Sequence, residues 1–365
     1  MATAHKSYTA NETLAEALDR LTAPGKLYRA EGDKIRCLAC GHRCLIASGM
    51  RGICKVRFNR DGILRVPFGY VAGLASDPIE KKPFFHVYPG SAALTFGMMG
   101  CDLHCAYCQN WVTSQALREP AAASPVDTIT PARIVEIAMR TGARSVVSSY
   151  NEPLITAEWA AAVFEQAHPC GLLCAFVSNG NATPEVLDFL APWLKACKVD
   201  LKTFNDRQYR QLGCPLANVL ETIKMLHARK IWVEIVTLVV PGFNDSENEL
   251  RDIARFIAGI SRDIPWHVTA FHQDYKMTGP RNTTAADLIR AARIGAEEGL
   301  HYVYAGNLPG RVSQWEDTRC PKCGTTLIRR HGYLIEDYFI TNDGTCPKCK
   351  LAIPGIWDGA TQPQQ

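Results

Sequence analysis

The chain carries one loop in which three cysteines stand close together, Cys101, Cys105 and Cys108. Their C-x3-C-x2-C spacing can supply three thiolates to a cluster of four irons, and clusters of this type normally take four cysteine ligands. With three thiolates, one iron is open to a ligand from outside the chain, and a small chelating molecule there can receive an electron. The alternatives are a zinc knuckle or three buried thiols, although zinc knuckles favour C-x2-C pairs with a fourth ligand. The spacing therefore favours a redox cluster.

This loop resembles the cluster-binding motif of the radical S-adenosylmethionine (SAM) superfamily. In that superfamily the amino and carboxylate groups of SAM chelate the open iron, and the aromatic residue before the third cysteine, here Tyr107, lies beside the adenine. The resemblance implies a 4Fe–4S cluster and SAM as cofactors. It also implies that one electron from the cluster splits SAM into methionine and a 5′-deoxyadenosyl radical, which abstracts hydrogen from a substrate.

Eight more cysteines form two sets of four, one on each side of this loop. The first set has the spacing C-x2-C-x3-C-x9-C and could hold zinc or a second, complete Fe–S cluster; we favour zinc, although the spacing does not separate the two. The second set consists of two C-P-K-C knuckles around a hairpin-like segment, which predicts a zinc-ribbon or rubredoxin-like module holding zinc or iron, with zinc favoured. The sets are Cys37, Cys40, Cys44 and Cys54, and Cys320, Cys323, Cys346 and Cys349.

The composition is that of a globular protein whose cysteines are reduced. The chain has 365 residues, 15 of them cysteine, and no apolar N-terminal segment or membrane-spanning run. We therefore expect a cytoplasmic protein with no membrane association, in which cysteines bind metal instead of forming disulfides. A net charge of +4 does not by itself predict nucleic-acid binding. Basic residues near the second knuckle leave a nucleic-acid-binding ribbon open, but a solvated charged face is the expectation: Arg329, Arg330, His331 and Lys348.

The elements that position the cysteine loop alternate between short apolar runs and helical patterns. Six runs read as buried strands with helices between them, which implies a parallel sheet with right-handed crossovers. We predict an α/β fold, a partial (β/α)6 TIM-like barrel, with an N-terminal cysteine-rich element and a C-terminal ribbon. The predicted domains are residues 1–90, 91–310 and 311–365. The predicted strands are residues 92–96, 145–149, 172–177, 196–201, 231–239 and 266–271.

Polar motifs follow these predicted strands, where a parallel barrel carries its chemistry. They are similar to motifs of the pyruvate formate-lyase activases, a resemblance that assigns Glu152 to the SAM amino group and Ser178 with Asn179 to the same surface. It assigns Asp200 and Lys202 to the ribose hydroxyls and carboxylate of SAM. His272, at the end of the sixth strand, is a candidate nucleotide contact. The alternatives are a solvated glutamate, a barrel-mouth ion pair and a structural histidine.

Three further segments narrow the family: DPIEKKP at residues 77–83, CQNW at 108–111 and YAGN at 304–307. They resemble the radical SAM member of the so-called AmmeMemoRadiSam system, and the resemblance runs from residue 37 to 357. Its genes lie beside those for Memo-like and AMMECR1-like proteins, which are therefore expected partners. An electron donor such as flavodoxin or ferredoxin is also expected.

The activity analogy is activation of a glycyl-radical enzyme, whose substrate is a protein backbone; RNA, another protein or a small molecule stay open as substrates. The sequence names no catalytic residue that acts on the substrate itself. The rival interpretation is a multi-metal electron-transfer or nucleic-acid-binding protein without SAM turnover. The strand-end motifs argue against it, because an electron carrier has no need of Glu152, Asp200 and Lys202 around one cluster.

Overall fold

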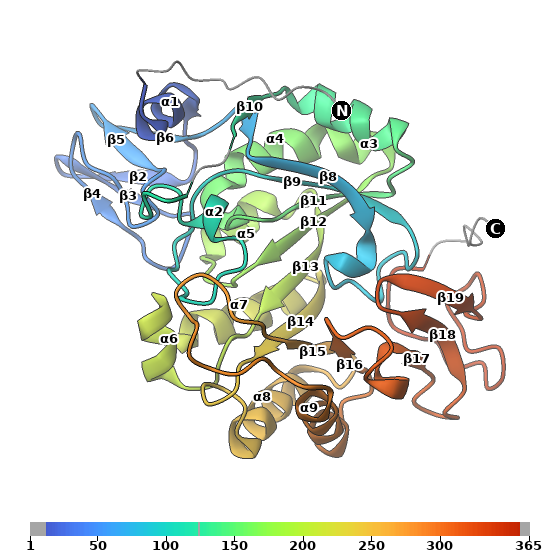
Figure 1. The fold of residues 1–365 in the computed structure, drawn as a ribbon. Helices are drawn as coiled ribbons and strands as arrows, with labels where there is room; N and C mark the ends of the chain where they lie inside the picture. The colour runs from blue at the N-terminus through green and yellow to red at the C-terminus, as the bar shows by residue number, and fades with distance from the viewer. Residues whose placement is uncertain (1–11, 123–124, 358–365) are drawn as a thin grey trace.

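A curved eight-stranded sheet forms the centre of the computed structural model, which describes residues 12–122 and 125–357 (Figure 1). The strand order is β16-β15-β14-β13-β12-β11-β9-β8. All pairs from β9 to β16 are parallel, and β8 pairs with β9 in the antiparallel sense. The strands are β8 (Gly73–Pro78), β9 (Ala92–Gly97), β11 (Ser145–Ser148), β12 (Leu173–Ser178), β13 (Leu194–Asp200), β14 (Trp232–Val239), β15 (Trp266–Ala270) and β16 (Val303–Gly306).

The α-helices between the strands begin at side-chain caps that the sequence provides. Thr130, Thr183, Ser246 and Thr284 each accept a hydrogen bond from a backbone N–H three residues later. The helices are α1 (Leu14–Arg20), α2 (Trp111–Ser114), α3 (Pro131–Arg140), α4 (Ala157–Ala167), α5 (Pro184–Leu190), α6 (Asp206–Leu212), α7 (Leu216–Ala228), α8 (Glu247–Ile260) and α9 (Ala285–Glu297). Short 3-10 helices are η1 (Ile79–Lys81), η2 (Pro153–Thr156), η3 (His168–Cys170) and η4 (Ser313–Glu316).

The α/β partial barrel predicted from the sequence is confirmed, and all six predicted strands lie in its parallel sheet. The structure adds β16 as a seventh parallel strand and β8 as an antiparallel edge. Both escaped prediction because β16 has only four residues and β8 is polar and half-exposed. Since β8 lies within residues 1–90, the sheet reaches into the predicted N-terminal domain; the domain boundaries stay a prediction.

The N-terminal cysteine-rich element consists of two small antiparallel sheets at the left of the barrel in Figure 1. A buried ion pair anchors it, because the Arg57 guanidinium lies 2.7 Å from the Glu158 carboxylate on α4. Its strands are β1 (Thr22–Pro24), β2 (Tyr28–Glu31), β3 (Lys34–Cys37), β4 (Leu45–Ile46), β5 (Phe58–Arg60) and β6 (Ile63–Pro67). The short strands β7 (Tyr70–Val71) and β10 (Asp127–Thr128) pair with each other.

The C-terminal module is a three-stranded antiparallel sheet at the right of Figure 1. Its strands are β17 (Thr318–Arg319), β18 (Thr326–His331) and β19 (Leu334–Tyr338). Leu327 and Ile328 pack in one buried cluster with Phe85 and Tyr304 of the barrel. The module is therefore fused to the barrel by a shared core.

We expected Arg330 on a solvated basic face of this module. This expectation is wrong, because Arg330 is buried. Its guanidinium donates hydrogen bonds to Thr318 Oγ1 at 2.7 Å and to the carbonyl of Phe85 at 3.0 Å. It also lies 4.3 Å from the centre of the Phe85 ring. Arg330 therefore joins the module to the barrel and is not available to nucleic acid.

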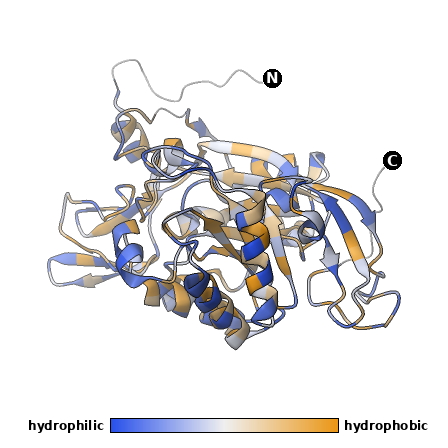
Figure 2. Ribbon diagram, turned by 60° about the horizontal axis from the view of Figure 1, so that its bottom comes forward, coloured by the Kyte–Doolittle hydropathy of each residue, from blue (hydrophilic) through white to orange (hydrophobic). Residues whose placement is uncertain are grey.

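Hydropathy follows this layering, since apolar residues gather in the central strands and the helices carry both apolar and polar faces (Figure 2). Within residues 12–122 and 125–357, no helix combines the length and the apolar character needed to cross a membrane.

Candidate active site

The three-cysteine loop leaves the barrel directly after β9. The end of this strand needs glycine, because a Cβ on Gly97 would lie 2.4 Å from the carbonyl oxygen of Ser149. Beyond it, Cys101, Cys105 and Cys108 line a cavity of about 100 Å³ whose other wall includes Asp200 and Lys202. The three thiols and the predicted strand-end residues therefore share one space.

The chemistry of the three thiols fits a metal cluster. Burial raises the pKa of all three, that of Cys105 to about 12 even though the nearby Lys202 ammonium acts in the opposite direction. Such thiols do not ionise readily by themselves, whereas metal binding deprotonates them. Three sulfurs on one side of a cavity, with charged groups opposite, suit a cluster that has one iron left for an outside ligand.

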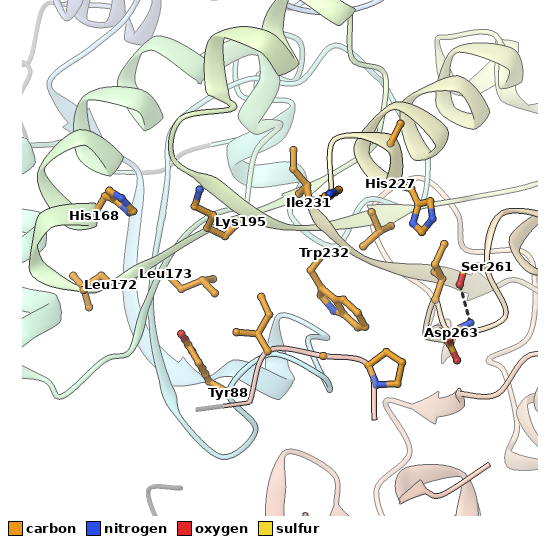
Figure 3. Close-up of a pocket in the computed structure, with 18 residues that line it drawn as sticks. Tyr88, His168, Leu172, Leu173, Lys195, His227, Ile231, Trp232, Ser261 and Asp263 are labelled. Carbon is orange, nitrogen blue, oxygen red and sulfur yellow. Dashed lines mark hydrogen bonds between the residues drawn. The ribbon is translucent and has the colours of Figure 1, made fainter. Parts of the chain in front are cut away.

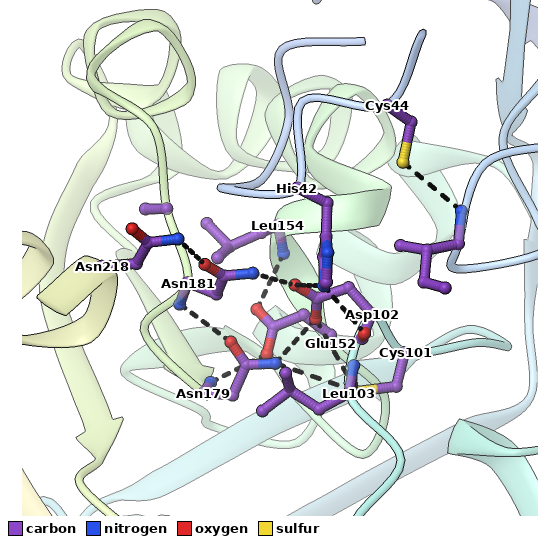
Figure 4. Close-up of polar contacts among 12 residues, drawn as sticks. His42, Cys44, Cys101, Asp102, Leu103, Glu152, Leu154, Asn179, Asn181 and Asn218 are labelled. Atoms are coloured by element: carbon purple, nitrogen blue, oxygen red, sulfur yellow. Dashed lines mark hydrogen bonds and ion pairs between the residues drawn. The ribbon is translucent and has the colours of Figure 1, made fainter. Parts of the chain in front are cut away.

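Glu152 is held rigidly beside this cavity (Figure 4). Its Oε1 accepts hydrogen bonds from Ser178 Oγ at 2.7 Å and from the Leu154 N–H at 3.1 Å, and its Oε2 accepts one from the Asn179 N–H at 2.8 Å. Burial raises the pKa of Glu152, and the negative charge of Asp102 adds to the shift. A ligand ammonium at this carboxylate would therefore stabilise its charged form.

Asp102 is a fully buried carboxylate that the sequence analysis did not single out. Asn179 Nδ2 donates to its Oδ1 at 2.7 Å, and Asn181 Nδ2 donates to its Oδ2 at 2.8 Å. Asn179 Nδ2 also lies 3.8 Å from Cys101 Sγ, so the network reaches the first thiol. The position of Asp102 inside the cysteine motif could have indicated its role, because an acidic side chain next to a thiolate ligand needs hydrogen-bond donors around it.

Asp200, the last residue of β13, lies between Lys198 of the same strand and Lys202, two residues beyond its end. Lys202 Nζ lies 3.0 Å from Asp200 Oδ2, and Lys198 Nζ contacts Asp200 Oδ1. Burial acts to raise the pKa of Asp200, but the two ammonium groups hold it at about 2. Lys198 was missed by the sequence analysis; a lysine within an apolar strand was the signal for it.

Tyr107 and His272 occupy different places. Tyr107 is buried and lines a cavity of about 380 Å³ that adjoins the first through Cys105 and Cys108. Its ring centre lies 5.8 Å from that of Phe243. His272 is exposed and lines a separate, outer cavity. The structure thus brings together all the predicted SAM contacts except His272: Tyr107, Glu152, Ser178, Asn179, Asp200 and Lys202.

The outer cavity measures about 750 Å³ and connects the barrel mouth with the C-terminal module. Gln109, Thr269 and Asn307 line both this cavity and the inner one around Tyr107. Tyr333, at the turn between β18 and β19, also lines both. The module therefore forms a wall of the space in front of the cysteine loop.

A larger cavity of about 1010 Å³ lies at the other end of the barrel (Figure 3). It is lined by the first residues of β12 and β14, Leu173 and Trp232, and by Lys195 near the start of β13. Parallel barrels carry their chemistry at the carboxyl ends of the strands. This cavity is therefore not the candidate active site, despite its size.

The C-terminal cysteines form a compact group. Cys320 and Cys349 have their sulfurs 3.5 Å apart, and those of Cys323 and Cys346 are 3.7 Å apart. All four sulfurs lie within 4.8 Å of one another. This spacing fits a single tetrahedral ion. The four-thiolate site is as predicted, and zinc as its metal stays a prediction.

Residues 97–257, which contain the cysteine loop and most of the barrel, match the family model described as Radical SAM superfamily. Among solved structures, a radical SAM methyltransferase from Sphaerobacter thermophilus aligns with 84% of this chain and 81% of its own, at 14% identity and a TM-score of 0.48.

The relatives found by sequence match different lengths of this chain. The uncharacterized protein MJ0808 of Methanocaldococcus jannaschii is 36% identical over 325 residues, 88% of this chain and 95% of its own. The isethionate sulfite-lyase activating enzyme of Desulfovibrio desulfuricans is 33% identical over 131 residues, 34% and 42% of the two chains. The pyruvate formate-lyase-activating enzyme of Staphylococcus aureus is 25% identical over 195 residues, 51% and 76%. The three-thiol cavity, the family model and the similarity to MJ0808 over most of both chains together show that the chain belongs to the radical SAM superfamily of enzymes.

Proposed function

We propose that this enzyme cleaves SAM reductively at a 4Fe–4S cluster held by Cys101, Cys105 and Cys108, and uses the product to abstract hydrogen from a macromolecular substrate. When bound, the cluster and SAM supply one-electron cleavage to methionine and a 5′-deoxyadenosyl radical. The observation that carries the proposal is the shared cavity, in which three thiols face Asp200 and Lys202.

The residues of the chain bind and orient SAM in this proposal. Glu152, fixed by three hydrogen bonds, accepts one from the SAM ammonium. Lys202 pairs with the SAM carboxylate and Asp200 with the ribose hydroxyls, and Tyr107 lies against the adenine. The buried walls exclude water, which protects a reactive radical from side reactions.

A protein segment is the substrate class that we favour, as in glycyl-radical activation. Two of the relatives are named as activating enzymes of isethionate sulfite-lyase and pyruvate formate-lyase. The outer cavity also supports the assignment, because about 750 Å³ of space leads from the surface to the inner site. Memo-like and AMMECR1-like proteins, and flavodoxin or ferredoxin as electron donor, stay predicted partners.

The rival interpretation, a multi-metal carrier or nucleic-acid-binding protein without SAM turnover, has less support. Membership of the radical SAM superfamily favours an enzyme. The buried position of Arg330 also removes one basic side chain from the surface of the C-terminal module that a nucleic acid would need.

Anaerobic reconstitution tests the activity. The full chain, loaded with iron and sulfide, is incubated with SAM and dithionite, and 5′-deoxyadenosine is measured by chromatography. We expect its formation in the native protein and its loss in Cys105→Ala. If the two proteins form equal amounts, the proposed cleavage is wrong.

Deuterium transfer tests the substrate class. Protein, RNA and small-molecule fractions are prepared from deuterium-labelled cells and added separately to the reconstituted enzyme. We expect deuterium in 5′-deoxyadenosine with the protein fraction, because hydrogen abstraction carries the label to the radical. Label from the RNA or small-molecule fraction alone would overturn the protein assignment.

A further inference from the structure

The N-terminal cysteines lie in one small element beside the active-site loop. Cys37, Cys40 and Cys54 are buried, and Cys44 is partly exposed. The hairpin of β3 and β4 brings the first and third together, with the Cys37 N–H donating to the Cys44 carbonyl at 2.9 Å. Cys40 and Cys54 pack in one buried cluster with Val56 and Ile155. Cys44 Sγ also accepts a hydrogen bond from the N–H of Ile53, the residue before Cys54, so these contacts connect all four cysteines.

The spacing of these thiols differs from that of the C-terminal set. One tetrahedral ion with metal–sulfur bonds of about 2.3 Å holds its thiolates about 3.8 Å apart. Cys320, Cys323, Cys346 and Cys349 have this spacing, whereas among the described residues no three of the N-terminal sulfurs lie within 4.8 Å of one another. In a 4Fe–4S cluster each thiolate binds a different iron, which sets the sulfurs farther apart. The sulfurs of Cys101, Cys105 and Cys108, which belong to the described residues as well, likewise do not all lie within 4.8 Å of one another.

The N-terminal set also touches the loop of the first cluster (Figure 4). His42, two residues after Cys40, has its Nε2 3.2 Å from the carbonyl oxygen of Asp102, the neighbour of Cys101. The Gly41 N–H donates to the carbonyl of Asn181 at 2.8 Å. A Cβ on Gly41 would lie 2.3 Å from Asn181 Oδ1, so only glycine permits this approach. The two cysteine sets are thus in direct contact through the hydrogen bonds of His42 and Gly41.

From these observations we propose that Cys37, Cys40, Cys44 and Cys54 hold a second 4Fe–4S cluster, which relays electrons to the cluster of the Cys101 loop. The inference rests on the proposed function, and it replaces the zinc that spacing alone favoured. A reduced ferredoxin- or flavodoxin-type protein gives one electron to the N-terminal cluster and is itself oxidised by one electron. The N-terminal cluster then gives that electron to the first cluster, and no bond forms or breaks in either transfer.

The outer face of the N-terminal element suits such a donor. Four large apolar side chains are exposed there, Leu45, Met50, Ile53 and Ile63. The Ile53 N–H donates to Cys44 Sγ at 3.4 Å, so the most exposed of the four thiols lies at this surface. Lys55, two residues after Ile53, is exposed and adds a positive charge there, whereas the exposed Arg60 is followed by the exposed Asp61. An acidic one-electron carrier protein matches an apolar surface with a positive charge beside it.

Metal analysis of the reconstituted full chain is the first test. Two clusters predict about eight irons and about eight acid-labile sulfides per chain, besides one ion in the C-terminal site. In Cys40→Ser/Cys54→Ser we expect about half of both to be lost, with the SAM-induced change in the electron paramagnetic resonance spectrum retained. Cys170→Ser, an exposed cysteine outside all three sets, is the matched control and should lose nothing.

The outcomes separate this inference from the proposed function. About four irons and about two zinc ions in the native protein would overturn the second cluster while leaving SAM cleavage intact. Because this measurement needs no substitution, it holds even if the double variant folds poorly. Loss of 5′-deoxyadenosine in Cys105→Ala tests the proposed function independently.

A comparison of two reductants, flavodoxin and dithionite, tests the relay. We expect 5′-deoxyadenosine formation by Cys40→Ser/Cys54→Ser to fall by about tenfold or more with reduced flavodoxin, which is a barrier change of about 1.4 kcal/mol. With dithionite, which is small enough to reach the inner cluster, the rate should stay close to the native value. Equal losses with both reductants would overturn the relay.

Discussion

The three-cysteine loop and the C-terminal ribbon both offer cysteine sulfur as the ligand atom, but the two sites serve different purposes. In the ribbon, four sulfurs lie within 4.8 Å of one another and fill a tetrahedral shell. In the loop, three sulfurs border a cavity whose opposite wall carries Asp200 and Lys202. The difference teaches that the number of thiols and the space left beside them separate a structural ion from a reactive centre.

The surroundings of the two sites differ in the same sense. Behind the loop, amide groups of Asn179 and Asn181 hold the Asp102 carboxylate. Around the ribbon, Leu327 and Ile328 pack with aromatic residues of the barrel. A polar network can fix a site whose charge changes, whereas an apolar core supplies stability to a site whose charge does not.

The largest expected effect comes from removing one of the three thiols. Cys105→Ala should abolish 5′-deoxyadenosine formation, because two thiolates do not hold the cluster in place. Anaerobic turnover with dithionite measures this, with Cys170→Ala as the control. Turnover in the alanine variant would remove the distinction between the reactive loop and the ribbon.

Removing one thiol of the ribbon should instead make the ribbon less ordered. Apparent binding energies of about 10–16 kcal/mol for structural zinc in small fingers indicate how strongly such an ion supports its fold. We expect Cys346→Ala to lose the C-terminal ion and to expose β17–β19 to protease, while the SAM-linked cluster keeps its iron. Limited proteolysis and metal analysis check this. An intact ribbon without its ion would show that the shared apolar core suffices.

Arg330 tests the junction between the two regions. Its Nε lies 3.8 Å from the buried Glu80 carboxylate, so Arg330→Met removes the cation beside Glu80 and one hydrogen bond of Thr318. Breaking a buried ion pair costs about 3–5 kcal/mol, and chemical unfolding should show a loss of that size. Arg329→Met is the matched control, because the Arg329–Asp337 pair is exposed and worth about 1 kcal/mol or less. Equal losses in the two variants would contradict the buried junction.

The smallest expected effects concern SAM binding. Glu152→Gln, Asp200→Asn and Lys202→Met should each weaken SAM affinity about ten- to a hundredfold, since a charged hydrogen bond is worth about 1.5–3 kcal/mol. Equilibrium binding measures this, and iron content should stay near the native value. His272→Ala should bind SAM normally, because His272 lines only the outer cavity. Normal affinity in all three charge variants would disprove the proposed contacts.

Local patterns in the sequence predicted the barrel well. The run at residues 131–140, with Thr130 before it and proline at its first position, is α3 as predicted, because the cap and the apolar face both lie within it. The strand-end residues Glu152 and Asp200 also lie together, since parallel strands end at one edge of the sheet.

Contacts between distant segments escaped prediction. Arg330 was expected at a solvated face, but it is buried because Phe85, far away in the sequence, packs over it. Nothing near Tyr333 indicates that a hairpin turn lines the cavity in front of Tyr107. Burial that depends on such pairings has no local signature, so it becomes visible only in the folded chain.

The arrangement of the cavities has a kinetic consequence. The inner spaces at Glu152 and Tyr107 lie behind the outer cavity, and Gln109 and Tyr333 belong to the passage between them. We therefore expect that a polymer substrate of the kind proposed above, once seated in the outer cavity, obstructs this passage. On that proposal SAM is the first reactant to enter, and its fragments are the last products to leave.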